Sequence, residues 1–386
     1  MSVETITLGC RLNFAETETI AGSVPASEDW VIVNSCAVTN EALRQTRQAI
    51  RRAHRENPGA KILVTGCAAE LDSATFVSMP GVSRVLENSR KLNAFAANDV
   101  MAPAGLLANV KSFVAIQTGC DHRCTFCSIW QARGPSVSLR FEAIRDAIAR
   151  EIDRGAKEIV LTGVDITDYE GGLGKLGQRL LAAEPRLNRL RLSSLDSIEI
   201  DGALFELIAG ERRLMPHFHL SLQAGDDMIL KRMKRRHSRA DAVRTVERIK
   251  SARSDASIGA DLIAGFPTET EEMSLNSLKL LDDCDIVAAH VFPFSARPAT
   301  PAARMPQLPR ELVKARATRL RQAAVDRRKR WLKSLTGTTQ PILVEGPGTG
   351  HTDSFAPVEI TGGCRGETGL ATIVGSNGEK LTAVWA

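Results

Sequence analysis

The feature that most constrains the fold is an alternation of short apolar runs with longer helical patterns along most of the 386 residues. Runs rich in Val and Ile, separated by amphipathic stretches, are typical of βα units that build a parallel sheet. The alternation falls into two sets, and a chain of this length has room for two or three domains. The sequence therefore predicts two successive α/β domains, followed by a shorter segment of different character.

The first set predicts a parallel α/β domain over residues 1–100. Its expected strands are residues 3–9, 30–35, 61–66 and 83–87. The clearest helical pattern covers residues 40–56. Residues 98–109 include Met-Ala-Pro-Ala-Gly and break any periodicity, which predicts a linker.

The second set predicts a domain over residues 109–334 with six strands. These are expected at residues 114–118, 158–163, 189–194, 218–223, 258–265 and 286–294, with helices such as 141–154 and 240–252 between them. Six βα repeats fit an incomplete TIM-type (β/α)6 barrel, whose chemistry lies at the C-terminal ends of its strands. In residues 335–386, Gly-rich turns separate short alternating runs, which predicts a small all-β module.

Basic residues are concentrated in three places. Lys and Arg total 50 against 45 Asp and Glu, yet residues 310–333 hold ten basic and two acidic residues, and residues 231–239 hold six basic residues and no acid. Arg44, Arg47, Arg51 and Arg55 recur at a spacing that lines one helix face. Such clusters indicate either a polyanionic partner, nucleic acid first, or a solvated helix face.

Cysteine use points to metal binding or catalysis. No run approaches the roughly 20 apolar residues that span a bilayer, and the acidic start Met-Ser-Val-Glu lacks the pattern of a secretory signal. We therefore expect a cytoplasmic protein without membrane association. Disulfides are rare in that compartment, so the eight cysteines call for another explanation.

Three cysteines share one tight loop directly after the first predicted barrel strand. Cys120, Cys124 and Cys127, here called the loop triad, have the spacing CxxxCxxC. Three thiols at this spacing can hold an iron–sulfur cluster and leave one iron open to a substrate or cofactor. The alternative is a structural zinc site that uses His122, although such a site normally closes with a fourth ligand.

Three further cysteines each follow a predicted strand of the first domain. Cys10, Cys36 and Cys67, here called the strand-end triad, are expected to converge because parallel strands end at one edge of the sheet. This arrangement favours a second cluster over three separate buried thiols. Cys284 and Cys364 lack such company and are expected to be core thiols. The GxGxxG at residues 172–177 begins nine residues beyond Gly163, so we expect a flexible loop rather than a dinucleotide site.

Together these motifs resemble the radical S-adenosylmethionine methylthiotransferase family. The loop triad matches the radical SAM motif, and the segments TLGCRLN, NSCAVT and TGCA, at residues 7–13, 34–39 and 65–68, resemble the three cysteine segments of the family's N-terminal domain. The resemblance covers nearly the whole chain. It implies a flavodoxin-like parallel α/β domain, a central radical SAM barrel and a C-terminal TRAM-like β-barrel.

Further segments are similar to one branch of that family. Residues 220–227, 230–237, 261–267 and 290–295 resemble the enzymes that act on threonylcarbamoyladenosine in tRNA. Neighbouring branches act on isopentenyladenosine in tRNA or on an aspartate of a ribosomal protein. The threonylcarbamoyl group adds a carboxylate near the base, which the cationic segment Lys234-Arg235-Arg236 suits by charge-assisted hydrogen bonds.

The resemblance implies two 4Fe–4S clusters. The cluster on Cys120, Cys124 and Cys127 would chelate S-adenosylmethionine and cleave it to a 5′-deoxyadenosyl radical, and the cluster on Cys10, Cys36 and Cys67 would carry or donate the sulfur. A second S-adenosylmethionine would methylate that sulfur. Cofactor contacts are expected at strand ends and in the cysteine loop, from Phe126, Gly163, Asp165, Ser194, Gln223 and Ile263–Gly265.

The implied substrate is the adenosine beside the anticodon of tRNA, extruded from its loop as recognition of single-stranded RNA commonly requires. The resemblance also implies a reductant protein such as a flavodoxin or ferredoxin, and we expect a monomer. Two other classes stay open at this point. One is a non-catalytic RNA-binding protein with structural zinc, and the other is a radical SAM enzyme that does not insert sulfur.

Overall fold

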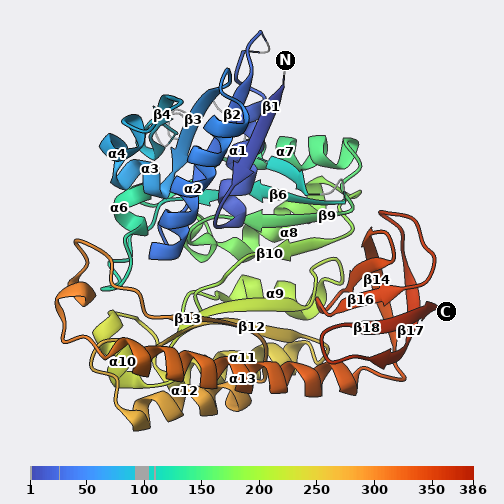
Figure 1. Ribbon diagram of the computed structural model, residues 1–386. Helices are drawn as coiled ribbons and strands as arrows, with labels where there is room; N and C mark the ends of the chain where they lie inside the picture. Colours follow the sequence, from blue (N-terminus) through green and yellow to red (C-terminus); the bar gives the residue numbers. More distant parts are fainter. Residues whose placement is uncertain (1, 26, 92–103, 108–109) are drawn as a thin grey trace.

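The structure is a computed structural model that describes residues 2–25, 27–91, 104–107 and 110–386. Figure 1 shows three parts in chain order: a parallel sheet near the N-terminus, a curved array of strands and helices in the middle, and a small barrel at the C-terminus. The predicted α/β class is therefore confirmed. Within the described residues, no helix combines the length and apolar character needed to cross a bilayer.

The N-terminal sheet has four parallel strands in sequence order. They are β1 (Val3–Thr7), β2 (Trp30–Ser35), β3 (Lys61–Gly66) and β4 (Val82–Leu86). The connecting helices are α1 (Arg11–Ala21), α2 (Asn40–Glu56), α3 (Cys67–Leu71) and α4 (Ser73–Val77). Helix α2 begins where expected because the Thr39 hydroxyl accepts a hydrogen bond from the Ala42 amide.

Six parallel strands in two sheets form the incomplete barrel. They are β6 (Lys111–Ala115), β9 (Glu158–Thr162) and β10 (Leu190–Leu192), then β11 (His217–Gln223), β12 (Ser257–Ala264) and β13 (Ile286–Pro293). Single parallel bridges, Leu190 to Leu214 and Leu195 to Leu220, connect the two sheets. These strands follow the predicted order, so the partial TIM-type architecture is confirmed.

Helices cover the outer face of the barrel. They are α7 (Phe141–Asp153), α8 (Leu173–Ala183), α9 (Gly202–Gly210), α10 (Asp227–Met233), α11 (Arg239–Ala252) and α12 (Glu271–Asp283). Outward-facing strand residues such as Val114 and Leu161 share one buried core with helix residues such as Ile148. Shorter elements complete this part: β7 (Gln117–Thr118), α6 (Ile129–Arg133), β8 (Val137–Ser138), η1 (Ile166–Asp168) and η2 (Pro301–Arg304).

Two local expectations were wrong. Residues 104–107 of the predicted linker form strand β5 (Ala104–Leu107), which pairs antiparallel with β6, whereas residues 98–103 and 108–109 lie outside the described residues. The predicted flexible loop at 172–177 is the first part of α8. A Cβ on Gly174 would lie 2.1 Å from the Leu204 amide nitrogen of α9, so this glycine allows two helices to pack closely.

A long helix leads to the C-terminal barrel. Helix α13 (Arg310–Ser334) packs against β13 and α12, and Figure 1 shows it running beneath the barrel strands. The closed barrel that follows consists of β14 (Thr339–Gly346), β15 (Thr349–Thr352), β16 (Pro357–Ile360), β17 (Thr368–Ser376) and β18 (Leu381–Trp385). The predicted all-β module is confirmed.

The C-terminal barrel docks on the central barrel through the turn after β15. Phe355 lies between His217 and His351, with ring centroids 5.2 and 4.6 Å away, and the Arg191 and Lys111 cations lie 4.7 and 4.8 Å from its ring centre. Ser257 Oγ donates to the Ser354 carbonyl oxygen at 2.6 Å. Phe355 therefore closes the end of the central barrel opposite the C-terminal ends of its strands.

Candidate active site

The loop triad lies at the C-terminal end of the first barrel strands. Gly119 precedes it with φ +76°, and a Cβ there would lie 1.7 Å from the Pro135 carbonyl oxygen, so only glycine fits this turn. Thr125 fastens the loop to α10, because its hydroxyl donates to the Arg232 carbonyl oxygen at 2.7 Å. Burial raises the pKa of Cys120 to about 12 and that of Cys127 to about 11.

A buried arginine borders the loop triad. Arg235 Nη1 lies 3.8 Å from Cys124 Sγ, and Arg235 Nη2 donates to Asp196 and to the Ser221 carbonyl oxygen, both at 2.8 Å. Its neighbour Arg236 pairs with Glu199. Acids of the protein therefore already pair with both guanidiniums, and the expectation that this segment meets a substrate carboxylate stays a prediction.

An acidic cluster lies beside Cys120. His122 Nδ1 is 3.5 Å from Asp165 and its Nε2 is 3.3 Å from Glu199, so His122 belongs to this cluster. The hydrogen bond to Glu199 raises the pKa of His122. Burial and the charge of Glu199 raise the pKa of Asp165 to about 6. A concentration of carboxylates beside the loop triad suits a cationic group such as an amine.

The strand-end triad assembles at the carboxyl edge of the N-terminal sheet. Cys36 follows β2, Cys67 opens α3 directly after β3, and Cys10 precedes α1. A Cβ on Gly9 would lie 2.8 Å from Cys36 Sγ, so glycine is required where β1 meets α1. Cys36 and Cys67 are buried, whereas Cys10 is exposed to solvent. Burial raises the pKa of Cys36 to about 11.

Arg133 connects the helix that follows the loop triad to the strand-end triad. It ends α6, the short helix that follows the loop triad, and it is buried with its Nε 3.3 Å from Cys67 Sγ. Its guanidinium also donates to Glu16 at 2.7 Å and to Asn13 at 2.6 Å. The charge of Cys67 contributes to raising the pKa of Cys127, so the two triads lie within electrostatic range of each other. Sequence analysis did not identify Arg133, because its partner Glu16 lies 117 residues away in the chain.

Arg297 is a second cation at the strand-end triad. Its Nη1 donates to Asn40 Oδ1 at 2.7 Å and its Nε donates to the Val38 carbonyl oxygen at 3.3 Å. Its Nη2 is buried and has no hydrogen-bond partner in the part of the chain that the structure describes. The charge of Cys36 acts on the pKa of this guanidinium, which places the cation near the thiols.

Both triads fit an iron–sulfur cluster. Cysteine thiolates are the preferred ligands of such clusters, and three of them concentrate negative charge that nearby cations must balance. The strand-end triad has Arg133 and the partly unpartnered Arg297, and the loop triad has Arg235, whose buried Nε also has no partner among the described residues. At the strand-end triad, Arg133 and Arg297 partly offset the burial that raises the pKa values of Cys10 and Cys36, and the cations at both places would balance the charge of bound thiolates.

The residues expected to contact S-adenosylmethionine lie at the ends of the barrel strands. Gly163 directly follows β9, Ser194 comes two residues after β10, Gln223 ends β11, and Gly265 follows β12. Phe126 and Ile263 belong to one apolar cluster.

Gln117 is a residue of this site that the sequence did not indicate. It fixes the turn after β9 because its Oε1 accepts hydrogen bonds from the Val164 and Asp165 amides at 3.0 and 2.9 Å.

The two remaining cysteines differ from each other. Cys284 is buried in the central core, as expected. Cys364 is exposed in the turn before β17, so its prediction as a core thiol was wrong. The Glu367 carboxylate holds this turn by accepting a hydrogen bond from the Cys364 amide at 2.7 Å. The Cys364 residue itself is exposed to solvent.

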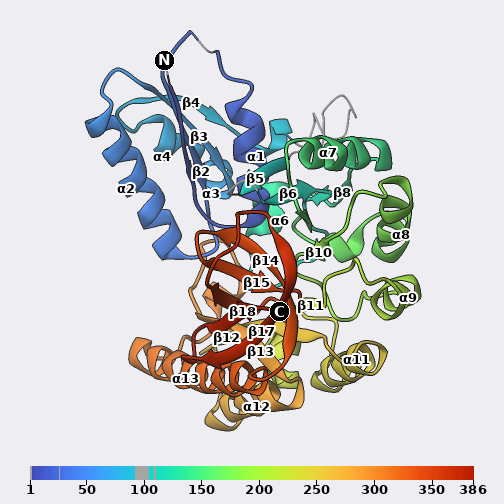
Figure 2. The ribbon, with the colours of Figure 1, turned by 90° about the vertical axis from the view of Figure 1, so that its right-hand side faces the viewer.

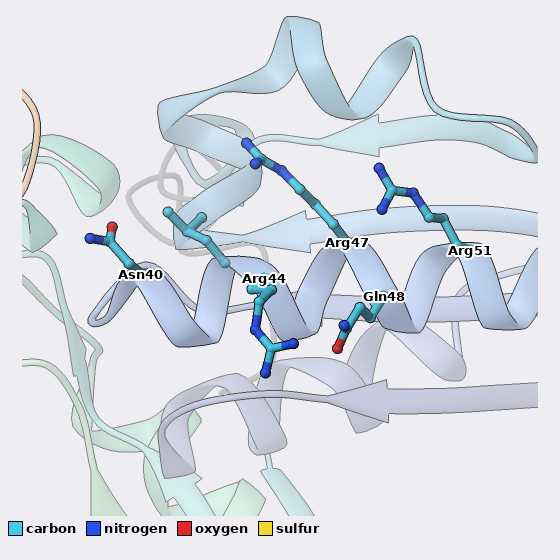
Figure 3. A pocket seen from close by; sticks show the side chains of 6 residues that line it. Asn40, Arg44, Arg47, Gln48 and Arg51 are labelled. Atoms are coloured by element: carbon cyan, nitrogen blue, oxygen red, sulfur yellow. The ribbon is translucent and has the colours of Figure 1, made fainter.

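The two basic helix surfaces, on α2 and on α13, differ in how many of their arginines pair with acidic side chains. Figure 3 shows Arg44, Arg47 and Arg51 lining one pocket along α2. Arg44 is held by Glu41 at 2.6 Å, whereas Arg51 is exposed and has no ion pair among the described residues. Helix α13 is partly neutralised by acids of α12 and the turn before it, through the pairs Arg316–Glu269, Arg319–Glu271, Arg327–Asp282 and Arg330–Asp282.

Two family models match successive parts of the chain. The sequence matches the radical SAM superfamily over residues 114–281 and the uncharacterised protein family UPF0004 over residues 2–86. The radical S-adenosylmethionine methyltransferase TsrM from Kitasatospora setae has the same fold, with a TM-score of 0.55, 15% identity, and coverage of 76% of this chain and 70% of that chain.

Curated relatives match over nearly the full length. The threonylcarbamoyladenosine tRNA methylthiotransferase MtaB of Rickettsia prowazekii is 42% identical, covering 92% of this chain and 91% of that protein. MtaB of Thermotoga maritima is 31% identical, covering 94% and 92%. The tRNA-2-methylthio-N(6)-dimethylallyladenosine synthase of Erythrobacter litoralis is 32% identical, covering 88% and 85%. The chain belongs to the radical SAM methylthiotransferase family.

Proposed function

We propose that this protein converts N6-threonylcarbamoyladenosine at position 37 of tRNA to its 2-methylthio derivative, using two 4Fe–4S clusters and S-adenosylmethionine. The observation that carries the proposal is the approach of the two thiol triads: Cys67 lies within electrostatic range of Cys127, and Arg133, from the helix that follows the loop triad, contacts Cys67. A methylthiotransferase must bring radical generation and a sulfur source to one carbon atom. The MtaB relatives, of which one is 42% identical, support the choice of substrate.

At the loop triad, acidic side chains would attract the amino group of the cofactor's amino-acid portion. The cluster bound there supplies the electron that cleaves S-adenosylmethionine. Asp165 and Asp196 form a negative surface beside Cys120 that attracts an amino group. Arg235 balances the charge at Cys124 and is itself held by Asp196. Phe126 and Ile263 provide an apolar surface nearby.

At the strand-end triad, Arg133 and Arg297 would balance the negative charge of the cluster ligands. Arg133 also holds α6 against α1 through its buried ion pair with Glu16. Cys10 is the exposed member of the triad. Its exposure supports access to the sulfur site from solvent for an incoming base.

The tRNA would contact basic residues outside the two triads. Arg51 and Arg47 on α2 and the exposed Lys234 suit the phosphates of an anticodon stem-loop. A base that reaches both triads must leave its stack, as in other RNA-modifying enzymes. A reductant protein such as a flavodoxin or ferredoxin would supply electrons.

A substrate comparison tests the proposal. Anaerobically reconstituted enzyme is given tRNA with threonylcarbamoyladenosine, tRNA with isopentenyladenosine, or ribosomal protein, and the products are identified by mass spectrometry. We expect methylthiolation of the first substrate with little activity on the other two. Preference for the isopentenylated tRNA would reject the substrate assignment and leave the radical chemistry intact.

Mutation of each triad tests the two-cluster assignment. The reconstituted protein should contain about eight irons with matching acid-labile sulfide. Replacing Cys10, Cys36 and Cys67 with Ala should halve the iron, preserve 5′-deoxyadenosine formation and abolish methylthiolation. Replacing Cys120, Cys124 and Cys127 should abolish both reactions. Stoichiometric zinc without sulfide would refute the cluster assignment.

A further inference from the structure

Arg297 belongs to the segment between β13 and η2, yet its side chain contacts the N-terminal part of the chain. The residue is only 4% exposed. Its Nη1 donates to Asn40 Oδ1 at 2.7 Å, and its Nε donates to the Val38 carbonyl oxygen at 3.3 Å. Figure 2 shows β13 and α2, the helix that Asn40 opens, in separate parts of the molecule. These two hydrogen bonds therefore join the end of the central barrel to the residues that follow Cys36.

Val38 connects Arg297 to Cys36. The amide of Val38 donates to Cys36 Sγ at 3.5 Å, and the carbonyl oxygen of the same residue accepts from Arg297 Nε. Burial lowers the pKa of Arg297, and Cys36 is the only charge in the described part of the chain that acts on it. Arg297 in turn lowers the pKa of Cys36. The guanidinium and the thiol are thus separated by one residue that contacts both.

One nitrogen of Arg297 has no partner. Its Nη2 is buried and donates to no acceptor within the ranges that the structure describes. The other two nitrogens are held by Asn40 and Val38, so the direction in which Nη2 points is fixed. A buried guanidinium N–H without an acceptor is costly. The position in front of Nη2 therefore suits an anion.

The other cation of the strand-end triad has no such donor left over. Arg133 donates from Nε to Cys67 Sγ, from Nη1 to Glu16 and from Nη2 to Asn13. Its charge is also balanced by Glu16 in a buried ion pair. Arg297 therefore has the charge and the free donor that could hold an additional anion at this triad.

The proposed reaction limits what this anion can be. A methylthiotransferase needs a sulfur atom besides those of its cysteines, and sulfide and thiolate are both anions. Three cysteines leave one iron of a 4Fe–4S cluster without a protein ligand, which gives such a sulfur a place to bind. Because Nη2 is buried, a small ion fits this position better than a phosphate of the RNA backbone, which is large and hydrated.

We propose that Arg297 binds, through Nη2, the anionic sulfur that the enzyme transfers, and so holds it at the strand-end triad before the reaction. The proposal rests on the proposed function. The contact is a hydrogen bond between a charged donor and a charged acceptor, which is stronger than one between neutral groups. Arg297 then serves sulfur binding and leaves the choice of tRNA to other residues.

The test measures binding of a sulfur anion without relying on turnover. The full-length protein carries Ala in place of Cys120, Cys124 and Cys127, so that the EPR signal of the reduced cluster comes from the strand-end triad alone. Sodium methanethiolate is titrated in anaerobically, and neutral imidazole is the second probe. Arg297→Gln should weaken methanethiolate binding by about tenfold to a hundredfold, the range of a hydrogen bond between charged groups, and should change imidazole binding little.

A matched control removes the same charge from the same segment. Arg304 ends η2 and is exposed, so Arg304→Gln should leave the affinities for both probes unchanged. Unchanged methanethiolate binding in Arg297→Gln, or an equal loss for both probes, would refute the proposal.

A second variant decides if Arg297→Gln binds no cluster. Arg297→Lys keeps the charge but lacks the forked donors, so it should lose affinity for methanethiolate and not for imidazole. Any other result for this variant would count against the proposal. If the parent protein with an intact Arg297 shows no cluster signal, the two-cluster part of the proposed function is rejected instead.

Discussion

Replacing Arg133 with Met should destabilise the protein strongly, because it leaves Glu16 buried without its main partner. Burial alone would raise the pKa of Glu16, but Arg133 and Lys91 lower it to about 2 from its ordinary 4.5. A difference of this size corresponds to about 3 kcal/mol of folding stability at neutral pH. Removing one partner of a buried ion pair typically costs 3 to 5 kcal/mol, which agrees with this magnitude.

Urea denaturation of the wild type and Arg133→Met, at pH 7 and in acid, measures this contribution. A lowered carboxyl pKa stabilises the folded state above pH 4.5, and this stabilisation is lost as the pH falls toward 2. The difference between the two proteins should therefore be about 3 kcal/mol at pH 7 and should shrink below pH 4.5.

A second arginine supplies the control. Arg154 also pairs with a buried glutamate, Glu151, at 2.8 Å, but 60% of the Arg154 side chain is exposed, so water can replace it. Arg154→Met should cost less than about 1 kcal/mol. Equal losses for the two variants, or a loss for Arg133→Met that persists unchanged in acid, would contradict the reasoning.

Three further predictions concern the docking of the C-terminal barrel and the RNA surface. Phe355→Ala should lower the free energy of unfolding by about 3 kcal/mol, because it empties the space between His217 and His351. A loss of less than about 1 kcal/mol, measured by urea denaturation, would argue against the importance of this contact. Burial would raise the pKa of Glu345, but His351 and Lys111 lower it to about 2. The stabilisation from this carboxylate is therefore lost as the pH falls from 4.5 toward 2, and limited proteolysis should show the C-terminal barrel loosening over that range and not at neutral pH. Arg51→Gln should flatten the dependence of log K on log salt for tRNA binding by roughly 0.7 to 0.9, whereas an unchanged slope would make this face of α2 a solvated surface.

Local pattern was sufficient to place the strands and the cysteines. The runs at 30–35 and 61–66 are strands with those bounds, and helix 40–56 begins and ends as predicted. Strand periodicity and turn residues act over a few neighbours, so the sequence alone reveals them. The convergence of Cys10, Cys36 and Cys67 could be predicted for the same reason, since parallel strands end at one edge.

Only the tertiary structure decided which charges are paired and which are left over. Arg133 and Glu16 are separated by 117 residues, and nothing in their local sequence relates them. Arg235 and Arg236 formed part of a cationic segment in the sequence, yet the fold gives them Asp196 and Glu199 as partners. Pairing of buried charges depends on contacts between distant segments, whereas periodicity depends on neighbours. The sequence therefore determined the framework and the positions of the two cysteine triads, and the fold alone determined the electrostatics around them.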